Sequence, residues 1–100
     1  MDIIEFIVSE IVRNDFNAKS YIRDKETFLK VFIEEYAYIS TKEPMGRMQM
    51  ITNPEVIIKK LELHDMKELQ EIVSQHLYKQ LYLQNKISES EYEEACQYLQ

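Results

Sequence analysis

Apolar residues recur three and four positions apart along most of the chain, the spacing that places side chains on one face of an α-helix. This pattern predicts a first helix over about residues 2–14 and a second over about 25–40. Asp24 directly precedes the second helix and fits an N-cap, since its carboxylate can accept from free backbone N–H groups. The polar stretch 14–23 predicts a loop or a short helical turn. The apolar positions of the two helices are Ile3, Ile4, Ile7, Val8, Ile11 and Val12, then Phe28, Leu29, Phe32, Ile33, Tyr36 and Ile39.

An irregular stretch, 41–53, follows the second helix and contains the only glycine of the chain. Asn53 before Pro54 is typical of a helix start and predicts a third helix over about 54–63, because proline needs no N–H partner in the first turn. We expect the irregular stretch to cover the core, although its methionines could instead adapt to a partner. These methionines are Met45, Met48 and Met50.

The last third of the chain predicts a helical hairpin. A capping-box spacing opens the longest helix, about 66–84, and Asn85 can end it in a left-handed conformation. A second capping box, Ser88 with Glu91, opens a final helix that runs to about residue 99. The first of these capping boxes consists of Asp65 and Glu68.

Composition supports a single all-α domain over residues 1–100. The chain has one glycine, two prolines, 45% hydrophobic and 30% charged residues, whereas β-sandwiches draw heavily on turn-forming residues. A short extended piece at 48–52 would have no second strand to pair with, so we expect no sheet. The predicted fold is a bundle of four to five short helices with a C-terminal αα-hairpin.

The net charge of −6 narrows the classes of partner. An acidic chain gains little from the counterion release that dominates nucleic-acid affinity, and anionic membranes do not attract it. The first residues have no basic segment typical of a signal peptide, and Cys96 is the only cysteine. A lone thiol fits a reducing compartment, so we expect a cytoplasmic protein.

No pattern of catalytic or cofactor-binding residues stands out. A single glycine excludes phosphate-binding loops, and one cysteine with two histidines excludes a clustered zinc site. Cys96 lies on the apolar face of its helix, where a thiol is inert. We interpret His76 as a boundary histidine satisfied by a polar neighbour, and His64 as a junction residue that could bond to Asp65. We therefore expect no enzyme, no metal and no cofactor.

Apolar side chains outside the main stripes are the candidates for a protein interface. Tyr78 and Tyr82 share the polar face of the longest helix, and tyrosine offers large area and a hydroxyl at interfaces. The alternative is that the final helix or the methionine-bearing stretch 41–53 folds over them. Val31 and Tyr38 stand off the stripe of the second helix in the same way, and Phe6 lies opposite the apolar face of the first.

The C-terminal helix carries acids and no basic residue. Glu93 and Glu94, with the aromatic Tyr98, could dock on a basic patch of another protein; alternatively this helix is simply a soluble surface. The leading prediction is a small acidic, non-catalytic protein-binding module, such as a regulator, adaptor or inhibitor of a protein with a basic surface, or a homodimer. Residue usage rich in Ile, Lys, Glu, Asn and Tyr is typical of AT-rich bacterial or phage genomes.

The alternative function is a small transcriptional regulator of helix-turn-helix type. Helices at about 54–63 and 66–84, joined by a short break, resemble that motif loosely. Glu62 stands where a small residue is usual, and the second helix starts with Asp65, Lys67, Glu68 and Glu71, whereas helices that read DNA carry Arg, Lys, Asn and Gln. We therefore do not expect nucleic acid as a partner.

Overall fold

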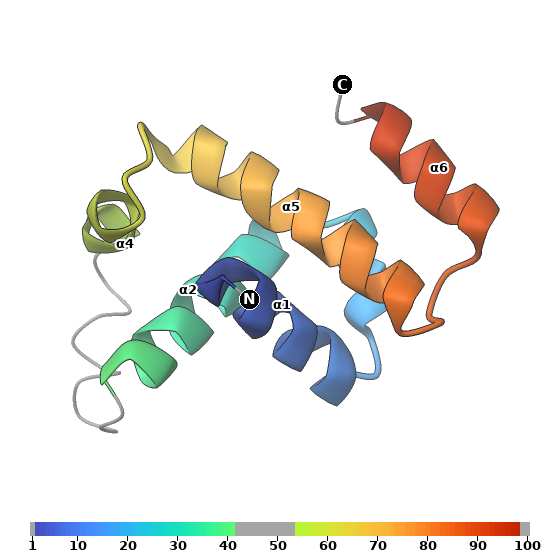
Figure 1. The fold of residues 1–100 in the computed structure, drawn as a ribbon, viewed down its shortest axis with the longest axis horizontal. Helices are drawn as coiled ribbons and strands as arrows, with labels where there is room; N and C mark the ends of the chain where they lie inside the picture. Colours follow the sequence, from blue (N-terminus) through green and yellow to red (C-terminus); the bar gives the residue numbers. More distant parts are fainter. Residues whose placement is uncertain (1, 42–53, 99–100) are drawn as a thin grey trace.

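The structure, a computed structural model, describes residues 2–41 and 54–98 (Figure 1). In these ranges the chain forms five α-helices, one short 3₁₀ helix and no strand, which confirms the predicted all-α bundle and its C-terminal hairpin. The stretch 42–53, with the methionines and the predicted N-cap Asn53, lies outside the described residues. The elements are α1 Ile3–Asn14, η1 Ala18–Ile22, α2 Lys25–Thr41, α4 Pro54–Lys60, α5 Met66–Leu83 and α6 Glu89–Tyr98.

Polar side chains cap α2 and α6 where the sequence predicts them, whereas the capping box predicted for α5 is half formed: Asp65 accepts from the Glu68 N–H at 2.9 Å, but the Glu68 carboxylate accepts from the His64 N–H. Asp24 accepts hydrogen bonds from the backbone N–H of Thr27 at 3.1 Å and from its hydroxyl at 2.6 Å. Ser88 and Glu91 form a reciprocal capping box, with 3.2 Å from each backbone nitrogen to the other side chain. These bonds satisfy backbone donors that the first turn of a helix leaves without a partner.

Two residues in the left-handed conformation end α4 and α5. Glu62 has φ 58° and Asn85 has φ 60°. After each of them the next backbone N–H bonds to the carbonyl five residues back, which is the Schellman arrangement. Asn85 therefore ends α5 as expected, whereas the turn at Glu62 ends α4 at Lys60, three residues before the predicted 63.

Helix α5 is the centre of the molecule, and all the other described helices pack against it. Helix α1 runs beside α5 in the same direction, because Lys79 pairs with Glu5 at 3.7 Å and, further along, the side-chain amide of Gln84 donates to the Ser9 carbonyl at 3.0 Å. The core side chains that are almost wholly excluded from solvent include Ile7, Val8, Val12, Phe28, Phe32, Ile57, Leu69, Leu77 and Leu81.

Helix α6 turns back along α5 at the end of the molecule away from α4 (Figure 1). Ile87 in the connection is buried, and so is Ala95 on the inner face of α6. The rings of Tyr82 and Tyr92 stack, with centroids 4.8 Å apart and planes 8° apart. Ile87 and the stacked rings of Tyr82 and Tyr92 therefore hold α6 against α5.

Candidate protein-binding groove

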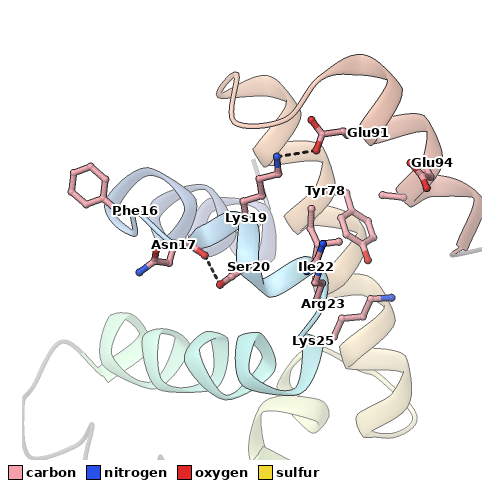
Figure 2. A pocket seen from close by; sticks show the side chains of 11 residues that line it. Phe16, Asn17, Lys19, Ser20, Ile22, Arg23, Lys25, Tyr78, Glu91 and Glu94 are labelled. Carbon is pink, nitrogen blue, oxygen red and sulfur yellow. Dashed lines mark hydrogen bonds and ion pairs between the residues drawn. The ribbon is translucent and has the colours of Figure 1, made fainter.

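A groove of about 940 Å³ lies between η1 and α6, over the side of α5 (Figure 2). Lys19, Ile22 and Arg23 line it from η1 and its C-terminal end, and Glu94 and Ala95 line it from α6. Tyr78 of α5 lies between these two walls. A groove with an apolar floor and charged sides can hold an extended or helical segment of another chain.

The turn before η1 is organised by Asp15. One carboxylate oxygen accepts from the backbone N–H of Asn17 at 2.8 Å, and the other accepts from the hydroxyl of Tyr21 at 2.6 Å. The Tyr21 hydrogen bond, followed by the Asn17 N–H, lowers the pKa of Asp15, and the same contact raises the pKa of Tyr21 to about 12. This bonding fixes the start of the η1 wall.

Phe16 stands in that turn and is one of the residues that line the groove. In Figure 2 its side chain points away from the protein, at the opposite end of the labelled side chains from Tyr78 and Glu94. The residue is 99% exposed, far more than Phe6 at 41% or Leu83 at 57%. The Asp15–Asn17 hydrogen bond closes the turn that carries Phe16. A phenylalanine this exposed buries almost no apolar surface within its own chain, and such a ring can be buried by another protein.

Tyr78 forms the floor of the groove and is 2% exposed. The ammonium of Lys25 lies 5.6 Å from the centre of its ring, which is a cation–π contact. The Tyr78 hydroxyl has no hydrogen-bond partner among the described residues, yet it does not count among their fully enclosed unpaired atoms. The oxygen therefore opens into the groove.

The two walls of the groove carry opposite charges. Lys19, Arg23 and Lys25 lie on the side of η1 and the start of α2, and Glu91 and Glu94 lie on α6. At one end, Lys19 and Glu91 bridge the walls at 3.0 Å (Figure 2). The Lys19 ammonium, followed by the Ser88 N–H, lowers the pKa of Glu91, so this acid is ionised and paired at neutral pH.

Tyr78 and Tyr82 do not form an exposed pair. Tyr78 is buried, and Tyr82 is half-buried beneath Tyr92. The alternative in which the final helix folds over them is the observed arrangement, because α6 returns along the face that carries both tyrosines. Tyr78 nevertheless lines the groove, so it belongs to the candidate site by its hydroxyl edge and not by an exposed ring.

The other interface candidates do not gather at one place. Val31 is half-buried against the core, and Tyr38 is exposed further along α2, outside the groove lining. Glu93 and Glu94 are both exposed on α6, and of the two Glu94 lines the groove. The side chain of Tyr98 lies outside the described residues.

The two histidines do not have the hydrogen-bond partners that the sequence predicted for them. The Nδ1 atom of His76 is buried and has no hydrogen-bond partner among the described residues, so the expected polar neighbour is absent there. His64 bonds to Glu68, and not to Asp65: the Glu68 carboxylate accepts from its backbone N–H and contacts its Nδ1, both at 2.8 Å. The His64 hydrogen bonds lower the pKa of Glu68.

Cys96 is half-buried and near Tyr92, whose pKa is raised by burial first and by the Cys96 contact second. Within the described ranges, no three His, Cys, Asp or Glu side chains gather as metal ligands. In the same ranges, none of the helices combines the length and apolar character that crossing a bilayer requires.

For the helix-turn-helix alternative, the turn between α4 and α5 is favourable and the charge of the two helices is unfavourable. Glu62 adopts the left-handed turn that a glycine would adopt, so its side chain does not prevent a tight connection between α4 and α5. Acids still outnumber lysines over these helices and their turn. The acids are Glu55, Glu62, Asp65, Glu68 and Glu71, and the lysines are Lys59, Lys60, Lys67 and Lys79.

In comparisons with protein-family models, curated proteins and solved structures, nothing matches this chain. Periodicity in the sequence did not predict the exposure of Phe16, since this residue lies between two helices where no apolar stripe applies. The polar neighbours Asp15 and Asn17, which favour a side-chain-closed turn, are the sequence signal that could have indicated it.

Proposed function

We propose that this chain is a small acidic, non-catalytic protein-binding module that holds a segment of a partner protein in the groove between η1 and α6. It would act as a regulator, an adaptor or an inhibitor. The observation that carries the proposal is the fully exposed Phe16 ring in the lining of a groove of about 940 Å³. Burial of a phenylalanine side chain stabilises a complex by about 1.5–3 kcal/mol, and such aromatic anchors dominate many interfaces.

The acidic wall gives the partner a preferred charge on one side. Glu93 and Glu94 are exposed, and no basic residue of α6 neutralises them. A partner with basic residues facing α6 would gain from these acids, mainly through a faster association. The lone Cys96 supports a cytoplasmic location for the encounter.

Site-specific photocrosslinking tests the proposal. A benzophenone-bearing phenylalanine analogue replaces Phe16 in the producing cells, and the matched control carries the same analogue at Phe6 of α1, outside the groove lining. We expect one protein to crosslink from position 16 and not from position 6. With that protein purified, Phe16→Ala should weaken binding about 10- to 100-fold, the equivalent of the burial free energy above, and Phe6→Ala by less than about threefold.

Equal crosslinking from both positions would contradict the proposal, and so would an unchanged dissociation constant in Phe16→Ala. Circular dichroism checks that both variants remain folded. Because Phe16 contributes no buried area, its replacement should not lower the melting temperature.

A DNA-binding regulator is the second candidate, and the left-handed turn at Glu62 is the observation that favours it. A gel-shift assay at two salt concentrations tests it. The expected signature is a salt-sensitive shift that is lost when Lys67 at the start of α5 is replaced by Glu. No shift at low salt would remove this candidate.

A further inference from the structure

Tyr78 is a buried polar side chain with an unused hydroxyl. The residue is 2% exposed, and its hydroxyl has no hydrogen-bond partner among the described residues. In Figure 2 the oxygen points towards the end of the groove where Lys25 lies, away from the Lys19–Glu91 bridge. Because this oxygen opens into the groove and has no partner within the described residues, it is free to donate to an acceptor that enters there.

Two cationic side chains line the same end of the groove. The Lys25 ammonium lies 5.6 Å from the centre of the Tyr78 ring, and Arg23 is the residue that follows η1. Within the described residues neither cation forms an ion pair. The adjacent Asp24 does not neutralise them by direct contact, because both of its carboxylate oxygens accept hydrogen bonds from Thr27.

We propose that Tyr78, Arg23 and Lys25 form a carboxylate-binding subsite that takes an acidic side chain of the partner's segment. A carboxylate can accept from a phenol hydroxyl, a guanidinium and an ammonium at once, and bonds of this charge-assisted kind are stronger than neutral ones. The inference rests on the proposed function, since the acidic residue belongs to the segment held in the groove.

The opposite wall sets the direction of that segment. Glu94 is exposed on α6 and would repel a second acid, whereas Glu91 is already paired with Lys19. The segment therefore presents its acidic residue to η1 and α2, and a basic or neutral residue to α6. The groove would therefore bind a segment that carries an acidic residue on one side, a basic or neutral residue on the other, and an apolar residue that contacts Phe16.

Selection from a library of displayed random peptides tests the subsite with the full chain at low salt. We expect selected peptides to share one acidic residue next to an apolar one. A synthetic peptide of the selected sequence should bind Tyr78→Phe about tenfold more weakly, because only the hydroxyl is removed. Arg23→Gln and Lys25→Gln should also weaken binding, whereas Tyr36→Phe and Lys67→Gln, which lie outside the groove lining, serve as matched controls and should not.

A second peptide, with its acid changed to alanine, completes a double-mutant cycle. It should bind the native chain and Tyr78→Phe with nearly equal affinity, since the group that the hydroxyl contacts has gone. The melting temperature of Tyr78→Phe should match that of the native chain, because the hydroxyl has no partner among the described residues.

The outcomes separate the two proposals. Peptides that need Phe16 but show no acidic preference, or that bind Tyr78→Phe normally, would overturn the carboxylate subsite and leave the groove as a binding site. Peptides that bind Phe16→Ala as well as the native chain would contradict the proposed function itself. A selection that yields no binding peptide would count against both.

Discussion

Replacement of Tyr92 by alanine should release α6 from the rest of the protein. Helix α6 packs mainly against α5, and the stacked rings of Tyr82 and Tyr92 are the large aromatic contact between them. A stacked pair contributes about 0.5–1.5 kcal/mol beyond its buried area. Burial of roughly 100 Å² of a half-buried tyrosine adds about 2.5 kcal/mol, which is an upper value since unfolded chains already bury some surface.

The loss in Tyr92→Ala should therefore be about 2–4 kcal/mol, and hydrogen exchange is the assay that locates it. We expect the backbone amides of α6 to exchange faster by this free energy, while those in the middle of α5 keep their protection. Tyr92→Phe is the matched control, because it keeps the ring stack and loses only the hydroxyl near Cys96. Unchanged exchange in α6, or equal acceleration in α1 and α5, would refute the reasoning that the stack fastens this helix.

Three further predictions concern the turns and the acidic wall. The pKa of Tyr21 is raised to about 12 by its bond to Asp15, so its contribution to stability is complete below pH 10 and is lost as the pH rises through about 12; Tyr21→Phe should remove this alkaline loss in urea titrations. Replacement of the left-handed residue Glu62 by Gly should stabilise the protein by about 1 kcal/mol, as measured by thermal unfolding. The replacement Asn85→Gly should stabilise it less, because asparagine tolerates this conformation. Reversal of Glu93 and Glu94 to Lys should slow association with the crosslinked partner at low salt and change little at high salt; an unchanged rate would show that the acidic wall has no part in the encounter.

Local signals in the sequence were sufficient to predict the helices. Asp24, Ser88 with Glu91, and Asn85 act at the termini as predicted, because each relies on backbone groups no more than a few residues away. The end of α4 was wrong by three residues, since a glutamate at position 62 gives no warning of a left-handed turn. Local sequence signals thus predict the helices better than they predict a C-terminus formed by a residue that seldom adopts the left-handed conformation.

The groove could not be predicted, because it depends on which helix covers which face. A helical wheel places Tyr78 and Tyr82 together on a polar face, but it does not show that α6 returns over that face. The exposure of Phe16 likewise follows from a turn closed by Asp15, at a point where the apolar period is interrupted. The groove depends on tertiary arrangement and the exposure of Phe16 on a local turn, and apolar periodicity indicates neither of them.

The most direct test of the central claim is a hydrogen-exchange footprint of the chain with and without its crosslinked partner. If the groove holds the partner's segment, protection should increase in η1, at the first turn of α2 and along α6, where the lining residues lie. The outer face of α4 and the first turns of α1 should remain unchanged. Protection confined to α4 and the start of α5, with none in η1 or α6, would contradict the account.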